Sequence, residues 1–201
     1  MLIQESLEKL KQEVREMAQE SIVIFDMAIK TMHSRDEMML ADVRSLDKKI
    51  DDMEMKLDKH CMEILLKEPY AIDFRYVFSS VKTISELERI GDQSKTVAKW
   101  SIKLDKISPD MVKLELKTRE ALTTAIKALV DWDAEVAAKV MELEFQVDEL
   151  EDAIINSSTD IAEAFIAKAL ERIGDIATNI AENVIFSVSA RDIRHGKFQN
   201  S

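Results

Sequence analysis

The residues whose type and spacing best suit a functional site are two acidic pairs, one on each copy of a repeated hexapeptide. The sequence LERIGD occupies residues 87–92 and returns at 170–175. Each copy carries a glutamate and, four residues later, an aspartate, so on a helix the two carboxylates lie on one face. These four residues are Glu88, Asp92, Glu171 and Asp175. The repetition indicates an internal duplication, and the duplicated part carries the candidate chemistry.

A second set of acidic pairs lies upstream of each hexapeptide. These pairs, again with four-residue spacing, are Asp47 with Asp51 and Glu144 with Asp148. In each copy the upstream and downstream pairs are equidistant from a stretch that predicts a turn, Pro69–Tyr70 in the first and residues 156–159 in the second. Residues equidistant from the turn of an antiparallel helical hairpin stand at the same height. We therefore expect four carboxylates at one level on two facing helices in each copy.

Such a concentration of carboxylates predicts a cation between the helices. The charges repel one another, and their desolvation is costly unless a positive group compensates them. Oxygen-only ligands suit magnesium, manganese, calcium or oxidised iron better than zinc or copper. In the second copy the acidic face continues to Asn179 and Glu182, whereas in the first it continues to Thr96 and Lys99. We expect the second site to bind metal more tightly, because a lysine ammonium repels a cation.

The plain alternative is that these acids lie on solvated helix faces and pair with nearby bases. The bases next to them in sequence are Lys48, Lys49, Arg89 and Arg172. The duplication and the mirrored positions favour the metal site over this alternative. The glycines of the hexapeptides, Gly91 and Gly174, point the same way. Each costs about 1 kcal/mol in a helix interior, so we expect a neighbouring helix to approach closely at these two positions.

The composition predicts an all-α protein that holds these pairs on long helices. Three glycines and two prolines in 201 residues leave little turn chemistry for a sheet. The formal net charge of −11 argues against a nucleic-acid partner. The single cysteine, Cys61, the charged N-terminal sequence and the lack of a long apolar run favour a cytoplasmic protein without a transmembrane segment.

The periodicity predicts two tandem antiparallel three-helix bundles, at 1–105 and 106–201, related by duplication. The expected helices run to HSRDE (33–37), then over about 35–67, 72–103, 109–130, 134–156 and 160–190. Ser34 with Glu37 has the form of a capping box, and Ser108 precedes Pro109 as a cap. The second helices of the copies are offset by 97 residues and the third by 83, so the hairpin of the second copy is 14 residues shorter.

Two such units, each with an acidic pair on its second helix and ERIGD on its third, resemble the PhoU family of phosphate-uptake regulators. The likeness spans about 5–194 and includes DFR (73–75), ERIGDIATNIAE (171–182) and DIRH (192–195). It implies frequent dimerisation and multinuclear metal clusters, with iron, manganese, magnesium or zinc as candidate ions. The implied ligands are the eight paired carboxylates, Asp47, Asp51, Glu88, Asp92, Glu144, Asp148, Glu171 and Asp175.

The resemblance also implies a function. A member of this family is expected to be a non-enzymatic negative regulator of the phosphate-starvation response, linking the ATPase of a phosphate ABC transporter to a sensor histidine kinase. One rival is a carboxylate-bridged di-iron enzyme, which usually needs Glu-x-x-His on two helices. Neither acidic pair has a histidine three residues later. A plain helical scaffold with incidental acids is the other rival. The shortened hairpin and the replacement of IATNIAEN by QSKTVAKW after the first ERIGD depart from the pattern.

Overall fold

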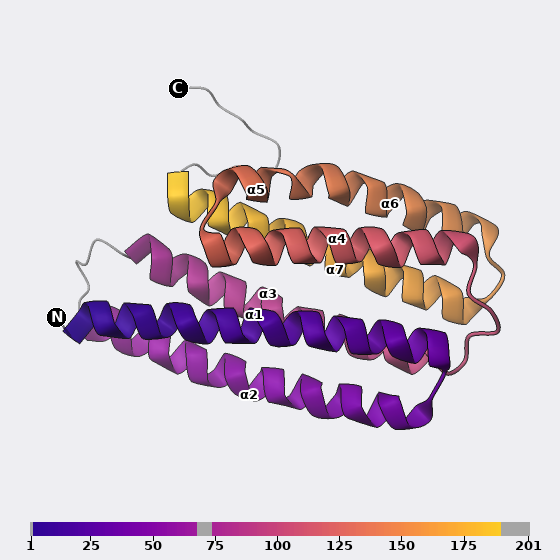
Figure 1. The fold of residues 1–201 in the computed structure, drawn as a ribbon, viewed down its shortest axis with the longest axis horizontal. Helices are drawn as coiled ribbons and strands as arrows, with labels where there is room; N and C mark the ends of the chain where they lie inside the picture. The colour runs from indigo at the N-terminus through magenta and orange to yellow at the C-terminus, as the bar shows by residue number, and fades with distance from the viewer. Residues whose placement is uncertain (1, 68–73, 190–201) are drawn as a thin grey trace.

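The structure, a computed structural model, describes residues 2–67 and 74–189 (Figure 1). Within these ranges every regular element is a helix and no strand occurs, so the all-α prediction is confirmed. The helices are α1 (Leu2–Ser34), α2 (Glu37–Lys67), α3 (Phe74–Ser101), α4 (Pro109–Asp131), α5 (Ala134–Ala138), α6 (Val140–Ser157) and α7 (Ile161–Ser189). The Pro69–Tyr70 turn and the DIRH stretch lie outside the described residues.

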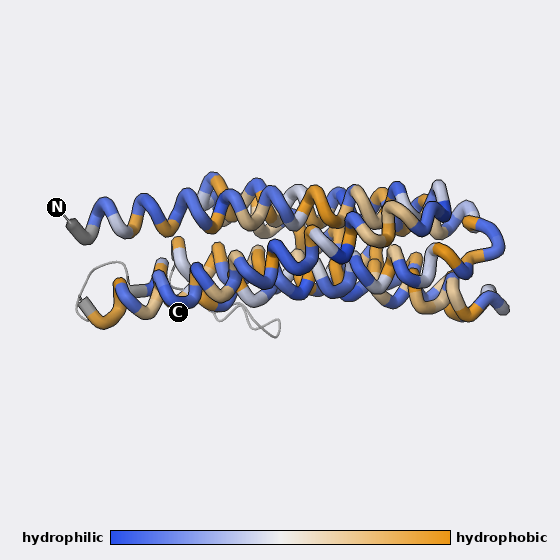
Figure 2. Tube along the Cα trace, turned by 90° about the horizontal axis from the view of Figure 1, so that it is seen from below, coloured by the Kyte–Doolittle hydropathy of each residue, from blue (hydrophilic) through white to orange (hydrophobic). Residues whose placement is uncertain are grey.

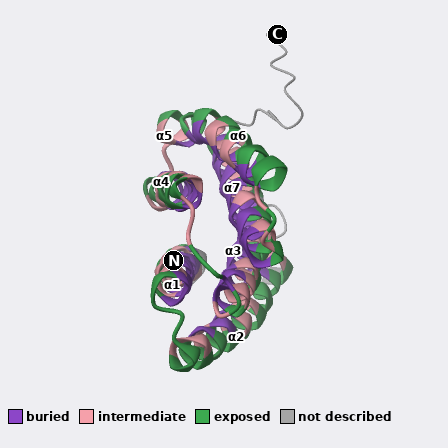
Figure 3. Cartoon of the chain, turned by 90° about the vertical axis from the view of Figure 1, so that its right-hand side faces the viewer, coloured by how far each residue is buried: buried purple, intermediate pink, exposed green. Residues whose placement is uncertain are grey.

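The helices form two three-helix units that lie side by side along one axis. Helices α1, α2 and α3 pack together, as do α4, α7 and the α5–α6 pair. Seen end-on, α1 and α4 form one layer, and α2, α3, α7 and α6 form a second, curved layer (Figure 3). Helices α3 and α7 share the most extensive contact between any two helices. The predicted pair of tandem bundles is therefore present, joined through the third helix of each.

One continuous apolar core runs through both units. Apolar residues recur along each helix with polar residues between them, the pattern of helices with one buried face (Figure 2). The largest fully buried side chains come from both halves and include Phe25, Ile50, Ile90 and Leu122. Cys61 on α2 is 0% exposed, and burial raises the pKa of its thiol to about 12. It is a small apolar core residue.

Specific side-chain contacts tie the two units together. Trp100 on α3 stacks on Phe165 on α7, with ring centroids 4.2 Å apart. In the other layer, Arg119 on α4 makes a bidentate pair with Asp26 on α1, with N–O distances of 2.8 and 3.0 Å. These contacts join the halves in both layers.

Helix α2 begins differently from the sequence prediction. Ser34 remains in α1, and Arg35 adopts a left-handed conformation with a φ of 56°. The cap of α2 is Asp36, whose Oδ1 accepts a hydrogen bond from the Met38 amide at 2.8 Å. The predicted capping box of Ser34 with Glu37 was wrong, because the left-handed residue between the helices moves the cap two positions along the chain.

Local signals in the second unit were more informative. Ser108 caps α4 as predicted, its Oγ accepting from the Met111 amide at 3.1 Å. The predicted break at 131–133 is confirmed: Trp132 is left-handed with a φ of 52° and ends α4, and Asp133 caps α5. The helix expected after this break is interrupted at Lys139, which separates α5 from α6.

The two hairpins differ in length and point to opposite ends of the molecule. Helix α2 has 31 residues and α6 has 18. The α6–α7 turn lies at the same end of the molecule as the 102–108 connection between the units. Helix α2 ends and α3 begins at the opposite end (Figure 1). No helix among the described residues is long and apolar enough to cross a bilayer.

Candidate metal centres

The α6–α7 hairpin brings its predicted acids together. Carboxylate oxygens of Asp148, Glu171 and Asp175 lie within 4.8 Å of one another. Three oxygen donors at this separation can share one cation. With Glu144 and Glu151, also on α6, these residues form what we call the C-terminal cluster. The hairpin geometry deduced from equidistant spacing is the arrangement that the structure shows for this cluster.

The α2–α3 hairpin carries the corresponding acids with a lysine between its helices, and no three of these described acids come within 4.8 Å of one another. The N-terminal cluster comprises Asp47, Asp51 and Glu54 on α2 with Glu88 and Asp92 on α3. The ammonium of Lys95 on α3 donates to Asp47 Oδ2 at 2.5 Å and to Asp92 Oδ1 at 2.7 Å. Lys95 therefore bridges the two helices with a charge that a metal ion would otherwise supply at this point.

Carboxyl pKa values are raised in both clusters, chiefly by burial and further by the charge of neighbouring acids. Burial, reinforced by Asp92 and other cluster acids, raises the pKa of Glu88 to about 7. Burial followed by Glu171 and Asp148 raises the pKa of Asp175 to about 6. Burial is also the main cause of raised pKa values at Asp51, Glu54, Glu144, Asp148 and Glu151. Additional positive charge would relieve this repulsion in either cluster.

Sequence reasoning missed one acid in each cluster. Glu54 and Glu151 are separated by the same 97 residues that relate Asp47 to Glu144, and each lies seven positions after the first acid of the predicted pair on its helix. Seven residues are close to two helical turns, so the side chain returns to the same face. The repeat offset contained this signal. Each cluster therefore has five carboxylates, three from the second helix of the bundle and two from the third.

Sequence reasoning also missed the two lysines that reach the clusters. Lys168 on α7 donates to Glu171 Oε1 at 2.8 Å and lies 3.6 Å from Glu151 Oε1. By the 83-residue offset, Lys95 corresponds to Thr178 and Lys168 to Ser85, so each lysine is specific to its own copy. Both lysines pair with an acid on each helix of their hairpin, but Lys168 pairs with Glu151 and Glu171, whereas Lys95 pairs with Asp47 and Asp92.

The continuation of the acidic face differs from the expectation. Asn179 donates from Nδ2 to Glu86 Oε1 at 3.3 Å, which directs its amide nitrogen across the α3–α7 contact. Glu182 lies near enough to contribute, after burial and Asp148, to the raised pKa of Glu144. Lys99 is exposed and lines a groove with Arg44 at the start of α2. The lysine that enters the N-terminal cluster is thus Lys95, and the role expected for Lys99 is corrected.

Other bases and histidines near the motifs pair elsewhere. Lys49 pairs with Glu20 at 2.8 Å, and Arg89 pairs with Glu86 at 2.9 Å. The histidines of the described chain pair with single glutamates outside the clusters, His33 with Glu115 and His60 with Glu13. His195 lies outside the described residues. Lys49 and Arg89 therefore pair away from the clusters, and the local pairing that does occur, through Lys95 and Lys168, involves two acids of each cluster.

The two hexapeptide glycines face the second helix of their own bundles. A Cβ on Gly91 would lie 3.3 Å from Asp47 Oδ1, with Ile50 as the next neighbour. A Cβ on Gly174 would lie 3.0 Å from Cγ1 of Val147, the residue equivalent to Ile50. Glycine therefore permits the close helix approach that was expected, beside the acids of each cluster.

Comparison with known proteins identifies the family. The PhoU domain family model matches residues 14–101 and again 111–184. The chain belongs to the PhoU family. Each PhoU match contains one complete cluster, since the ranges include all five carboxylates of their respective copies. The duplication inferred from the hexapeptide is thus a duplication of a PhoU domain, and the recognition made from sequence is confirmed.

Similar proteins include accessory components of transport systems. The chain is 31% identical over 84% of its length to the phosphate-specific transport system accessory protein PhoU of Serratia marcescens, covering 76% of that protein. It is 32% identical to the homologue from Pseudomonas aeruginosa, with 84% of this chain and 77% of that one covered. The crystal structure of PhoU from Pseudomonas aeruginosa superposes with a TM-score of 0.85 at 26% identity, covering 94% of this chain and 99% of that one.

Proposed function

We propose that this protein is an accessory protein of a phosphate-specific transport system and regulates phosphate uptake. The observation that carries the proposal is the pair of PhoU matches spanning most of the chain, together with relatives of that name over 84% of its length. In this proposal the protein has no enzymatic role, which agrees with the description of those relatives as accessory proteins. Its two units, 1–105 and 106–201, act together.

The finer part of the proposal concerns signalling. The protein acts as a negative regulator of the phosphate-starvation response, in the cytoplasm and as a homodimer, and couples the ATPase of a phosphate ABC transporter to a sensor histidine kinase. The support for this part is the family resemblance. Peripheral association with the membrane would then take place through these partners.

The carboxylate clusters are proposed to hold metal ions. The donor set fits, because Asp148, Glu171 and Asp175 present oxygens within 4.8 Å of one another, and burial together with the neighbouring acids raises the pKa of Asp175. Iron, manganese, magnesium and zinc are the candidate ions, and oxygen-only ligation favours the harder ones. A bound cation would compensate the cluster charges and brace α6 against α7. Each cluster has a lysine paired with two of its acids, but among the described residues only Asp148, Glu171 and Asp175 come within sharing distance of one cation, which favours the C-terminal cluster as the tighter site.

Deletion of the gene in its native host tests the regulatory function. We expect phosphate-starvation genes to become active in phosphate-rich medium, and the wild-type gene to restore repression. Complementation with the Asp148→Asn, Asp175→Asn double variant asks whether the C-terminal cluster is required, with Glu120→Gln on the exposed side of α4 as a matched control. Unchanged starvation-gene expression and phosphate uptake in the deletion strain would contradict the proposal.

The metal and enzyme alternatives are separated by measurements on purified protein. We expect bound metal in protein isolated without chelator, and less of it in the double variant. If metal-free protein has full regulatory activity, the cluster acids do not act through a bound metal, and the metal proposal is contradicted. An iron-loaded sample should not turn over oxygen or peroxide, and sustained turnover that depends on Asp175 would instead support the di-iron rival.

A further inference from the structure

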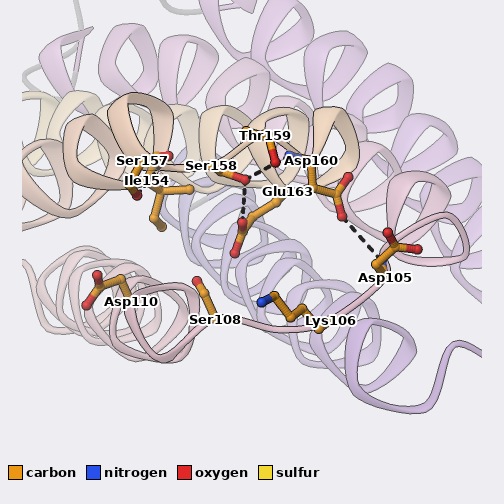
Figure 4. Close-up of a pocket in the computed structure, with 10 residues that line it drawn as sticks. All are labelled: Asp105, Lys106, Ser108, Asp110, Ile154, Ser157, Ser158, Thr159, Asp160 and Glu163. Carbon is orange, nitrogen blue, oxygen red and sulfur yellow. Dashed lines mark hydrogen bonds between the residues drawn. The ribbon is translucent and has the colours of Figure 1, made fainter.

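A cavity of about 300 Å³ lies at the end of the molecule where the two units are connected. Its walls come from the 102–108 connection, the start of α4, and the α6–α7 turn (Figure 4). It is separate from both carboxylate clusters. Its charged lining residues are Asp105, Asp110, Asp160, Glu163 and Lys106, so four acidic side chains face one basic one.

Glu163 gives this cavity an unfilled hydrogen-bonding position. The residue is 8% exposed, and its carboxylate extends from α7 toward the space above Ser108 and Lys106 (Figure 4). Its Oε2 accepts a hydrogen bond from Ser158 Oγ at 2.6 Å. Its Oε1 is buried and has no hydrogen-bond partner among the described residues. A buried carboxylate oxygen in this state calls for an external donor, because buried polar groups are normally paired.

The polar groups around Glu163 are held in place and already used. Ser158 Oγ also accepts from the Asp160 amide at 3.1 Å, and Asp160 Oδ1 accepts from the Ala162 amide at 2.8 Å. Asp160 Oδ2 accepts from the Asp105 amide at 3.3 Å, which fastens the connection between the units to the α6–α7 turn. These caps engage amides at the start of α7, so an anion would find those donors occupied.

The chemistry of the missing donor follows from size and charge. The net charge of the lining favours a cation. Among the described residues, three acidic, histidine or cysteine side chains come within metal-sharing distance at Asp148, Glu171 and Asp175, and the acids of this cavity do not. A bare metal ion would therefore lack a ligand set. A planar or branched organic cation with several N–H donors can reach Glu163 and the acids at the rim together.

We propose that this cavity binds an organic cation carrying a guanidinium or primary ammonium group, with Glu163 as its buried anchor. The site belongs to the second unit. The position equivalent to Glu163 in the first copy is Ser80, inside the longer hairpin. Shortening the hairpin by 14 residues brings its turn to the level of the 102–108 connection, and this meeting forms the cavity. A bound cation would clamp the connection between the units onto α7.

Isothermal titration with agmatine as the probe tests the site. We expect saturable binding at one site per chain, and binding weakened about tenfold or more by Glu163→Gln, which keeps the shape of the side chain and removes its charge. The matched control is Glu120→Gln, which removes the same charge from the exposed face of α4 and should change affinity less than about twofold. Tetramethylammonium has the same charge without N–H donors, and it should not bind.

The source of the cation is addressed with a second probe, N-acetyl-arginine amide. Affinity equal to that of agmatine would identify an arginine side chain of a partner protein as the natural occupant, and binding of agmatine alone would identify a free small cation. Either result supports the site. No saturable binding of either probe up to about 10 mM, or equal affinity in wild type and E163Q, would overturn it.

NMR mapping of agmatine binding on the wild-type chain tests the proposal even if E163Q folds poorly. Agmatine should shift the amide resonances of residues 105–110 and 158–163 and leave those of both carboxylate clusters in place. The rim variant Asp105→Asn should weaken binding by a smaller factor than E163Q. Shifts confined to either carboxylate cluster would also overturn the proposal, because they would place the cation at the acidic pairs.

Discussion

At the scale of single residues, the two clusters differ in the position of their lysine. Lys168 pairs with Glu151 and Glu171 in the C-terminal cluster and forms no ion pair with Asp148 or Asp175. Lys95 pairs with Asp47 and Asp92, whereas the equivalent position in the second copy is Thr178. A lysine ammonium about 4 Å from a cation costs roughly 1 kcal/mol in water and more in a less polar site. Lys95→Thr should therefore tighten metal binding at the N-terminal cluster by about tenfold. Calorimetric titration in an Asp175→Ala background, which removes a ligand of the other cluster, measures this change.

The reciprocal substitution provides the control. Thr178→Lys in an Asp92→Ala background should weaken the C-terminal cluster, because the new ammonium can reach the two helices of its hairpin as Lys95 does in the first. If Lys95→Thr leaves affinity unchanged while the chain remains folded, the ion pair of Lys95 does not compete with metal. The expected inequality of the two sites would then need another cause.

The raised carboxyl pKa values predict how metal-free protein responds to pH. Folding raises the pKa of Glu88 from 4.5 to about 7 and that of Asp175 from 3.8 to about 6. The protonated forms are thus favoured in the folded state, and their contribution to stability is complete below the unfolded values and lost as pH rises through the folded ones. The melting temperature of metal-free protein should fall as pH rises from about 4 to about 7. Thermal scans of a Glu88→Gln, Asp175→Asn variant should show a weaker dependence.

The acids of the clusters were predictable because the repeat marks them twice. Equidistance from a turn placed Asp148 opposite Glu171 without any knowledge of the packing. The lysines were not predictable in this way. Lys95 is 48 residues from Asp47, and whether its flexible side chain extends toward that carboxylate depends on the spacing between α2 and α3. The hydrogen bond from the Asn179 amide to Glu86 was not predictable either, because it crosses the α3–α7 contact between the two repeats, and neither repeat alone contains that contact.

At the scale of helices, the glycines control how closely the second and third helix of each bundle approach. A Cβ at Gly174 would meet Val147 Cγ1 at 3.0 Å, tighter than nine in ten real Cβ contacts, so Val147 would have to move by a few tenths of an ångström. Gly174→Leu should therefore destabilise the protein by roughly 1–3 kcal/mol through overpacking, although leucine is the better helix former. Urea unfolding measures the change. Ser85→Leu, on the exposed side of α3, is the control and should be close to neutral. A Gly174→Leu protein more stable than wild type would show that the helices can separate without cost.

Helix identity followed from sequence, whereas helix boundaries followed only in part. The Ser108 cap and the break at 131–133 were predictable because each depends on residues adjacent in sequence. The start of α2 was not, because the left-handed conformation of Arg35 decides between Ser34 and Asp36 as the cap. Both residues have suitable side chains, so composition could not choose between them.

At the scale of the whole molecule, the continuous core and the α3–α7 contact predict that both units unfold together. Metal binding to the folded state should then stabilise the entire chain. At an ion concentration of about 100 times Kd the gain is about 2.7 kcal/mol, or roughly 5–10 °C in melting temperature for a chain of this size. Chelator added to metal-loaded protein should lower a single calorimetric transition by this amount. An Asp92→Ala, Asp175→Ala double variant should not respond, and two separate transitions would show that the units are independent.

The number of units and their internal order were predictable, but their mutual placement was not. The repeat identifies which residues are equivalent and does not say which faces of the copies meet. Trp100 and Phe165, which stack across α3 and α7, occupy positions that are not equivalent in the two copies. No periodicity could therefore have paired them. The cavity beside Glu163 is a consequence of the same placement.

The burial of Cys61 turns the natural protein into a reporter of its own opening. Its thiol is the single one in the chain, is 0% exposed, and has a pKa raised to about 12, so reagents that consume thiolate should find almost nothing to attack in the closed state. The rate of Cys61 labelling would then report how often the first bundle opens and exposes the buried face of α2. Metal bound at the N-terminal cluster, which shares α2 with Cys61, should slow the labelling of Cys61. Metal bound only at the C-terminal cluster should slow labelling by the same factor only if the two units open together.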